Sequence, residues 1–272
     1  MRYEAIKNRT DKDFKRLTGV HHTIFKQMVA VLEQEMPQFG RPPKLSRADQ
    51  LLMTLMYWRE YRTQFHISQT YGLSESAVCR TIQKVEDSLV KSGQFTLPGK
   101  KALQASETAI EIILVDATEQ AIERPKKTQR AHYSGKKKSH TQKAQVIVNL
   151  DTLEIIAAAF SQGKKHDFQL FKESYGGIAQ EIFCLADSGY QGLTKLHENS
   201  QTPTKKSKHH PLTSEQKERN RALSRQRIYC EHVIGKLKIF RILKERYRNR
   251  RKRFGLRFNL IASIYNLSLK SC

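Results

Sequence analysis

The pattern of hydrophobic and polar positions changes after the first third of the chain. Apolar residues recur at helical spacing over roughly residues 10–35 and again over 45–90, which predicts several amphipathic helices. The stretch 37–46 between them contains three prolines and a glycine, so we expect an exposed linker. From residue 108 the apolar positions form short continuous runs typical of buried strands, and helical spacing returns from about 213. The chain should therefore join an all-helical part to an α/β part.

The segment 45–90 carries start and stop signals for three helices. Ser46, three residues before Asp49, forms a capping box that opens the first helix, and a second helix is expected at about 63–70. Gly72-Leu73-Ser74 makes a tight turn and supplies the N-cap of a third helix that runs from 75 to about 90. This order predicts a helix-turn-helix, in which the last helix enters the major groove of DNA. An ordinary three-helix bundle with a polar outer face is the alternative. The third helix exposes Ser76, Arg80, Gln83 and Lys84 as candidate DNA contacts.

The apolar runs of the second part predict strands in a fixed order. Strands are expected at 109–115, 144–150, 154–160 and 181–187, with a hairpin turn at 151–153 and a short helix at 166–175. Three strands in a meander, followed by a helical crossover to a fourth strand, match the ribonuclease H-like topology. That crossover places the fourth strand parallel to the first and beside it. The predicted fold class is therefore α/β, a mixed sheet flanked by helices, with a separate all-α N-terminal domain.

Charge decides between the interpretations of the helical part. The 272 residues include 49 Lys+Arg against 26 Asp+Glu, for a formal net charge of +23. So large an excess predicts a polyanionic partner, with nucleic acid ahead of an anionic membrane. The sequence shows neither a membrane-spanning apolar run nor a signal-peptide pattern, so we expect an intracellular protein, cytoplasmic and nucleoid-associated, without a membrane partner. The charge favours DNA binding by residues 45–90. Gly40-Arg41-Pro42 could serve as a minor-groove arm, although a plain connector is the simpler interpretation.

Two aspartates stand at the ends of predicted strands. AIEIILV ends at Asp116, and FCLA ends at Asp187, before a Ser-Gly-Tyr turn. Asp is a common turn residue, which is the simplest account of each. In the predicted topology, however, the two carboxylates would stand side by side, and their repulsion is relieved by a shared proton or a cation. In so basic a chain, we favour the cation.

A third carboxylate is expected from the last helices. Arg227, Glu231 and Lys238 are spaced by four and seven residues, so they fall within about 40° on one helix face. An ordinary surface ion pair between Arg227 and Glu231 is the alternative. Because Glu231 follows two strand-end aspartates in the right topological order, we interpret it as the third member of a site.

These residues carry a resemblance to a known family. LVDATE around Asp116, DSGY from Asp187 and the Arg227-x3-Glu231-x6-Lys238 spacing resemble the DDE signatures of insertion-sequence transposases, and HDFQLF (166–171) resembles the branch related to the Harbinger transposases. The resemblance covers nearly the whole chain in the right order. It divides the chain into 1–43, an N-terminal helical segment and linker; 44–100, the helix-turn-helix domain; and 101–272, the DDE catalytic domain. One departure is Ser224, where related enzymes often have a tyrosine.

The resemblance implies a chemistry and a set of partners. Asp116, Asp187 and Glu231 would ligate two Mg²⁺ ions, with Mn²⁺ as a substitute, for cleavage of double-stranded DNA at terminal inverted repeats and joining of the 3′-OH ends to target DNA. Arg227 and Lys238 would contact phosphates, and a homodimer or higher assembly on DNA is implied. A regulator that only binds DNA, or a ribonuclease H-like nuclease without strand transfer, remains the alternative.

Two further basic segments, 124–143 and 244–253, are candidate contacts to the DNA backbone, although a solvated charged face would have the same composition. Within the first, the lysines of the GKKK run are the strongest candidates: Lys136, Lys137 and Lys138. The four cysteines are scattered without a CxxC pair, so we expect reduced thiols rather than a zinc site or disulfides.

Overall fold

The computed structural model describes residues 1–37, 42–104, 109–206 and 211–270. The chain forms two compact units that are not simple halves of the sequence. The first combines Met1–Thr96 with Leu237–Glu245 and Leu256–Cys272, and the second combines Leu97–Lys236 with Arg246–Gly255. The linear domain boundaries at residues 43 and 100 stay a prediction. Gly40-Arg41, the core of the suggested arm, lies outside the described residues.

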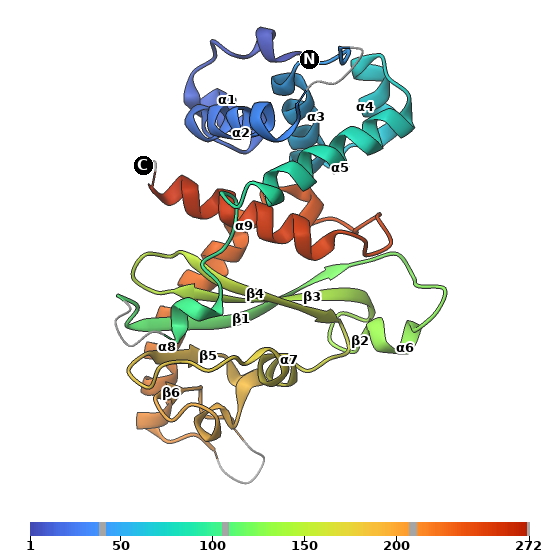
Figure 1. Cartoon of the computed structure of the whole chain (residues 1–272). Helices are drawn as coiled ribbons and strands as arrows, with labels where there is room; N and C mark the ends of the chain where they lie inside the picture. Colours follow the sequence, from blue (N-terminus) through green and yellow to red (C-terminus); the bar gives the residue numbers. More distant parts are fainter. Residues whose placement is uncertain (38–41, 105–108, 207–210, 271–272) are drawn as a thin grey trace. The chain divides into compact units, whose positions relative to one another are not determined.

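The first unit is built from helices. Its elements are η1 (Tyr3–Ala5), α1 (Asp11–Thr18), α2 (His22–Glu35), α3 (Arg47–Arg59), α4 (Gln64–Tyr71), α5 (Glu75–Lys91), η5 (Arg241–Leu243) and most of α9 (Phe254–Lys270) (Figure 1). The apolar stripes predicted for 10–35 and 45–90 are buried in it, and they include Phe14, Phe25, Trp58 and Val78. The three predicted helices of the helix-turn-helix segment are therefore present, within a residue or two of their expected bounds.

Short polar side chains set where these helices begin. Ser46 Oγ accepts a hydrogen bond from Asp49 N at 3.1 Å, as the capping box predicts, and Ser74 Oγ accepts one from Ala77 N at 3.3 Å. Between α4 and α5, Gly72 has φ +64°, a left-handed conformation that glycine adopts without steric cost. The local sequence, through Gly72 and Ser74, therefore determines the turn before α5.

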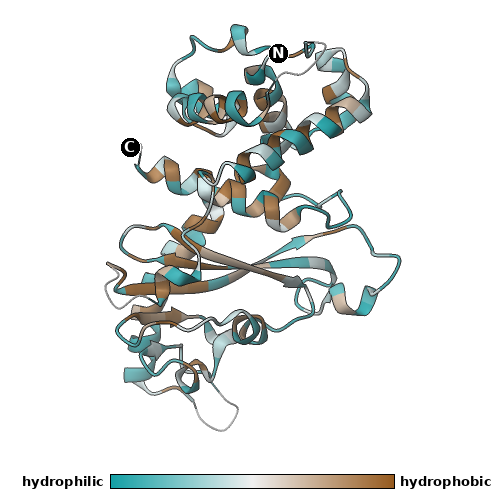
Figure 2. Ribbon diagram, viewed as in Figure 1, coloured by the Kyte–Doolittle hydropathy of each residue, from teal (hydrophilic) through white to brown (hydrophobic). Residues whose placement is uncertain are grey.

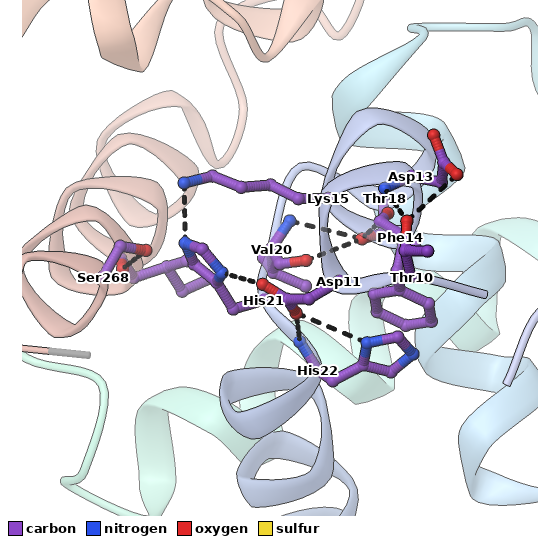
Figure 3. A network of polar contacts seen from close by, with 11 residues as sticks. Thr10, Asp11, Asp13, Phe14, Lys15, Thr18, Val20, His21, His22 and Ser268 are labelled. Atoms are coloured by element: carbon purple, nitrogen blue, oxygen red, sulfur yellow. Dashed lines mark hydrogen bonds and ion pairs between the residues drawn. The ribbon is translucent and has the colours of Figure 1, made fainter. Parts of the chain in front are cut away.

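A small polar network joins α1 to the start of α2 (Figure 3). Asp11 Oδ1 accepts a hydrogen bond from His22 N at 2.8 Å, and its Oδ2 lies 2.5 Å from His21 Nδ1. Lys15 Nζ contacts the other ring nitrogen of His21 at 2.7 Å. The His22 N–H and the His21 imidazole hold the pKa of Asp11 below its ordinary value. Asp11 thereby caps the N-terminus of α2 from a neighbouring helix.

The second unit is a six-stranded mixed sheet with helices around it. The strand order is β2-β3-β1-β5-β6, with β4 paired to β3; β1 is antiparallel to β3 and parallel to β5. The elements are η2 (Lys100–Leu103), β1 (Ile112–Ala121), α6 (Gln129–His132), β2 (Tyr133–Ser134), β3 (Ser139–Asn149), β4 (Ile155–Gln162), α7 (Asp167–Ser174), β5 (Phe183–Ala186), η3 (Ser188–Tyr190), η4 (Leu193–Lys195), β6 (Ser200–Gln201) and α8 (Ser214–Leu237). This is the predicted ribonuclease H-like arrangement.

Hydrophobic residues concentrate on the central strands, as Figure 2 shows for β1, β3, β4 and β5. On one face of the sheet, Val115 and Ile147 pack with Phe171 of α7 and Tyr190 of η3 in a single buried cluster. Asp116 follows Val115 in β1, so its side chain points to the opposite face. The polar group is thus placed on the face away from this cluster. Among the described residues, no helix is long and apolar enough to cross a membrane.

Two of the predictions that bear on the site residues were wrong. The first strand does not end at Asp116 but continues to Ala121, because Asp116–Ala121 keep pairing with Val146–Thr141 of β3. Helix α8 ends at Leu237, so Lys238 does not share a helix face with Arg227 and Glu231. A backbone turn begins at Lys238, and the 3.6-residue period no longer applies beyond it.

Candidate active site

Asp116 and Asp187 occupy equivalent places on neighbouring parallel strands. The paired register of β1 and β5 ends at Val115 opposite Ala186, and each aspartate is the next residue in its strand or loop. Beyond this pair β1 continues to pair with β3 but no longer with β5, so the edge that β5 leaves open begins at Asp116. The topology therefore brings together two carboxylates that are 71 positions apart in the sequence.

Backbone amides hold one oxygen of each carboxylate. Asp116 Oδ1 accepts from Ala117 N at 2.7 Å, and Asp187 Oδ1 accepts from Gly189 N at 2.5 Å, which caps the short helix η3. A Cβ added at Gly189 would lie 2.7 Å from Asp187 Oδ1 and 3.6 Å from Asp167 Oδ2. The Ser-Gly-Tyr turn thus needs glycine so that its amide can approach the carboxylate this closely.

Burial and neighbouring charge act on Asp116. Desolvation raises its pKa to about 6, and the negative charges of Asp187 and Glu231 act in the same direction. The Ala117 amide and the Arg227 guanidinium oppose them. Arg227 Nη2 also lies 3.9 Å from Asp187 Oδ2. The three predicted acids and Arg227 therefore share one electrostatic site, and a partly buried carboxylate with a raised pKa gains most from a nearby cation.

The carboxylates of Asp116, Asp187 and Glu231 are suitable ligands for a hard cation, but they are not gathered around one common position. Carboxylate oxygens are the ligands that Mg²⁺ prefers, and the sites that hold it keep several waters. Among residues 1–37, 42–104, 109–206 and 211–270, no three His, Cys, Asp or Glu side chains are gathered as a metal-binding group. Glu231 is exposed on α8, whereas Asp116 and Asp187 are half-buried. Closure around ions would require movement of side chains.

A buried ion cluster on the other side of β1 was missed by the sequence interpretation. Lys143 of β3 lies opposite Glu119 in the β1–β3 register, and its Nζ is 3.7 Å from Glu119 Oε1 and 2.6 Å from Asp167 Oδ1. The Lys143 side chain is only 5% exposed. Nearby, Gln145 Nε2 donates to the Tyr190 hydroxyl at 2.8 Å and to the Asp167 carbonyl at 3.0 Å. Thr141, Lys143 and Gln145 are polar residues that share one face of β3, and this was the signal that could have revealed the cluster.

The predicted DNA contacts lie on the surface of their units. Ser76, Arg80, Gln83 and Lys84 are exposed on α5, as expected for the last helix of a helix-turn-helix. Lys136, Lys137 and Lys138 are exposed in the turn between β2 and β3. Three dispersed cysteines, Cys79, Cys184 and Cys230, are free thiols. The exposed basic side chains are available to a polyanion, and their roles stay predictions.

Comparison with known proteins identifies the family. A family model described as "Transposase DDE domain" matches residues 107–267, and one described as "Helix-turn-helix of DDE superfamily endonuclease" matches residues 43–95. The chain belongs to the DDE transposases of insertion sequences. It is 49% identical over 272 residues to the probable transposase of insertion sequence IS702 from Microchaete diplosiphon, covering 99% of both chains.

A more distant relative agrees with this assignment. The transposase is 25% identical over 263 residues to the putative transposase of insertion sequence IS112 from Streptomyces albus G, covering 93% of both chains. No solved structure matches it. The helix-turn-helix match and the DDE match fall on the helical part and the α/β part that the sequence pattern separated. The branch related to the Harbinger transposases stays an expectation from the sequence.

Proposed function

We propose that this transposase binds the terminal inverted repeats of its element, cleaves the DNA at their ends and joins the freed 3′-OH ends to target DNA. The observation that carries the proposal is the pair of carboxylates at the open edge of the parallel β1–β5 register, with Glu231 close enough to raise the pKa of Asp116. The same residues would serve both steps. Water attacks the phosphodiester and releases a 3′-OH, and that hydroxyl then attacks a phosphodiester of the target and expels another 3′-OH.

Asp116, Asp187 and Glu231 would hold two Mg²⁺ ions, or Mn²⁺ in their place. Bound ions would neutralise charge on the attacking and leaving oxygens. The chain itself supplies the geometry. The Ala117 and Gly189 amides each hold one oxygen of a carboxylate, and the second oxygen of each aspartate would be the one to ligate a cation. Arg227 lies beside Asp187. When the Asp187 carboxylate ligates a cation, the Arg227 guanidinium would be free to donate hydrogen bonds to a phosphate oxygen.

DNA recognition is assigned to α5 and to basic loops. In a helix-turn-helix, residues near the N-terminus of the last helix reach base edges, which suits Ser76, Arg80 and Gln83, with Lys84 at the backbone. Lys136, Lys137, Lys138 and Lys238 are assigned to phosphates. Handling of two DNA ends requires at least two sites, so we propose a homodimer or higher assembly on DNA.

The decisive experiment is a strand-transfer assay with purified transposase, Mg²⁺ or Mn²⁺, and a duplex that carries the repeats flanking the gene. Glu231→Gln should lower cleavage and joining by roughly 10²-fold or more while DNA binding is retained, because a neutral amide ligates a cation poorly. Glu218→Gln, an exposed acid on the same helix, should leave both steps unchanged.

The alternatives give different results in the same assay. Specific binding without cleavage under either metal would point to a DNA-binding regulator. Metal-dependent cleavage without joining would point to a ribonuclease H-like nuclease. Equal activity of the wild type and Glu231→Gln would remove Glu231 from the site.

A further inference from the structure

A basic cavity of about 670 Å³ lies on the second unit, and none of its lining residues belongs to the acidic site. Its lining includes Arg124, Gln129, Arg130, Tyr133, His140 and Lys164. It contains no Asp or Glu among its lining residues. Volumes of about 300–1,000 Å³ are typical of pockets that take small ligands. The cavity is thus large enough for a compact anionic group, and its charge selects for one.

Three separate segments build this cavity and fix it to the sheet. Tyr133 of β2 pairs with His140 of β3, and their ring centroids are 5.6 Å apart at an interplanar angle of 76°. Lys164 N donates to the Ala131 carbonyl at 3.1 Å, which joins the segment that follows β4 to α6. Arg124 Nε donates to Gln129 Oε1 at 3.0 Å. Backbone hydrogen bonds therefore fix Tyr133, His140 and Lys164, and a side-chain hydrogen bond joins Arg124 to Gln129.

The turn between Arg124 and Gln129 has an uncommon backbone. Thr128 has φ +60°, a left-handed conformation that is unfavourable for a β-branched residue. Such strain persists only where surrounding structure enforces it, and it gathers at ligand-binding positions. Here it shapes the turn that carries Arg124 and Gln129 to the same cavity.

The exposed Tyr133 ring beside basic side chains indicates which class of anionic ligand the cavity would bind. Tyr133 is 43% exposed although it lies in a strand, and its ring packs against that of His140 in an edge-to-face pair. Arg124, Arg130 and Lys164 are all exposed beside it. Contact with the backbone of duplex DNA needs only the cations. A planar aromatic surface beside cations is the arrangement that binds an unpaired base together with its phosphates.

We propose that this cavity binds an unpaired nucleotide of DNA, with the base stacked on Tyr133 and its flanking phosphates on Arg124, Arg130 and Lys164. The proposal rests on the proposed function in that the nucleotide comes from a DNA end. It concerns binding alone, however, and stands or falls without any cleavage.

The test compares two probes with the full-length protein in EDTA: a blunt duplex and the same duplex with a three-nucleotide single-stranded overhang. Tyr133→Ala should weaken binding of the overhang probe about tenfold, since base–aromatic stacking is worth roughly 1–3 kcal/mol. It should leave the blunt duplex unchanged. Tyr133→Phe keeps the stacking surface and should bind both probes as the wild type does.

A charge variant provides a second measurement if Tyr133→Ala fails to fold. Lys164→Gln should reduce the salt dependence of overhang binding by about one phosphate contact, whereas Lys195→Gln, at an exposed site outside this cavity, should not. Equal losses on both probes would replace the proposal with a duplex-backbone site, and no loss on either probe would also overturn it. A protein that fails in strand transfer but shows the overhang preference would disprove only the proposed function.

Discussion

Lys143 Nζ lies 2.6 Å from Asp167 Oδ1 and connects the centre of the sheet to the first turn of α7. The lysine side chain is 5% exposed and that of Asp167 is 31% exposed, so the pair is largely shielded from water. Glu119, with 12% exposure, has its Oε1 3.7 Å from the same ammonium group. Since Asp167 Oδ2 also borders the Gly189 turn, the ion cluster supports the segment that positions Asp187.

Replacement of Lys143 by methionine should destabilise the transposase strongly. The two acids would lose their cation in a partly buried place, and loss of one partner from a buried ion pair costs about 3–5 kcal/mol. Because Asp167 retains partial exposure, we expect the free energy of unfolding, measured in urea, to fall by about 2–3 kcal/mol. Lys136→Met, at an exposed turn position, should change it by less than about 0.5 kcal/mol. Equal urea midpoints for the two variants would show that the cluster contributes no stability.

Asp116 should make the metal-free protein less stable as pH rises. Its folded pKa of about 6 exceeds the ordinary value of 3.8, so the folded state binds more protons between these values. The free energy of unfolding therefore falls as pH rises through this window. The full destabilisation by the ionised Asp116 carboxylate is present above about pH 6. Asp116→Asn should stabilise the protein by about 1–2 kcal/mol at pH 7.5 in EDTA, with little gain near pH 4.

Asp151→Asn, at an exposed position in the β3–β4 hairpin, is the matched control for this pH series. It changes the same chemical group outside the acidic site and should show no such gain at pH 7.5. Urea unfolding at each pH measures both variants. A gain from Asp116→Asn that is equal at pH 4 and pH 7.5 would exclude the carboxylate charge as its cause.

Gly189→Ala should impair catalysis more than folding. The new methyl group would lie 2.7 Å from Asp187 Oδ1, so the carboxylate would have to turn away from its place in the site. We expect roughly a tenfold or larger loss of strand transfer, since small misplacements of reacting groups cost up to about 10² in rate. Gly176→Ala, whose methyl group would meet nothing closer than 3.6 Å, should retain activity. Unchanged activity in Gly189→Ala would show that the site tolerates a displaced Asp187.

Local signals in the sequence were sufficient for much of the fold. Ser46 and Ser74 marked helix starts because a capping hydrogen bond involves residues only three positions apart. The strand order followed from run lengths and the handedness of crossovers, and it placed Asp116 beside Asp187. These features depend on neighbours in sequence or on general rules of topology.

Features that depend on partners distant in sequence were not predictable in this way. The strand of Asp116 continues past it because residues of β3 pair with it, and no pattern in LVDATE shows that pairing. Lys143 looked like one more cation in a basic stretch, although its burial depends on Asp167 and Glu119. Residues 237–245 and 256–270 pack with the helical unit despite following the DDE signature.

A buried charge pair in the helical unit provides the last prediction. Glu86 Oε1 accepts hydrogen bonds from Arg257 Nε at 2.6 Å and from Trp58 Nε1 at 3.0 Å, and the Glu86 and Arg257 side chains are 0% and 3% exposed. Glu86→Gln would leave the guanidinium buried without its anion, and Arg257→Met would leave the carboxylate without its cation. Each should cost about 3–5 kcal/mol of unfolding free energy.

The double variant Glu86→Gln with Arg257→Met should be more stable than either single variant, because it removes both charges and keeps an oxygen that accepts from Trp58 Nε1. Trp58 is the only tryptophan of the chain, so its fluorescence during urea unfolding reports this unit specifically. Additive losses in the double variant would mean that the two charges do not depend on each other. Smaller losses in the double than in the singles would show that residue 257, near the C-terminal end of the sequence, stabilises the helix-turn-helix unit by neutralising Glu86 of α5.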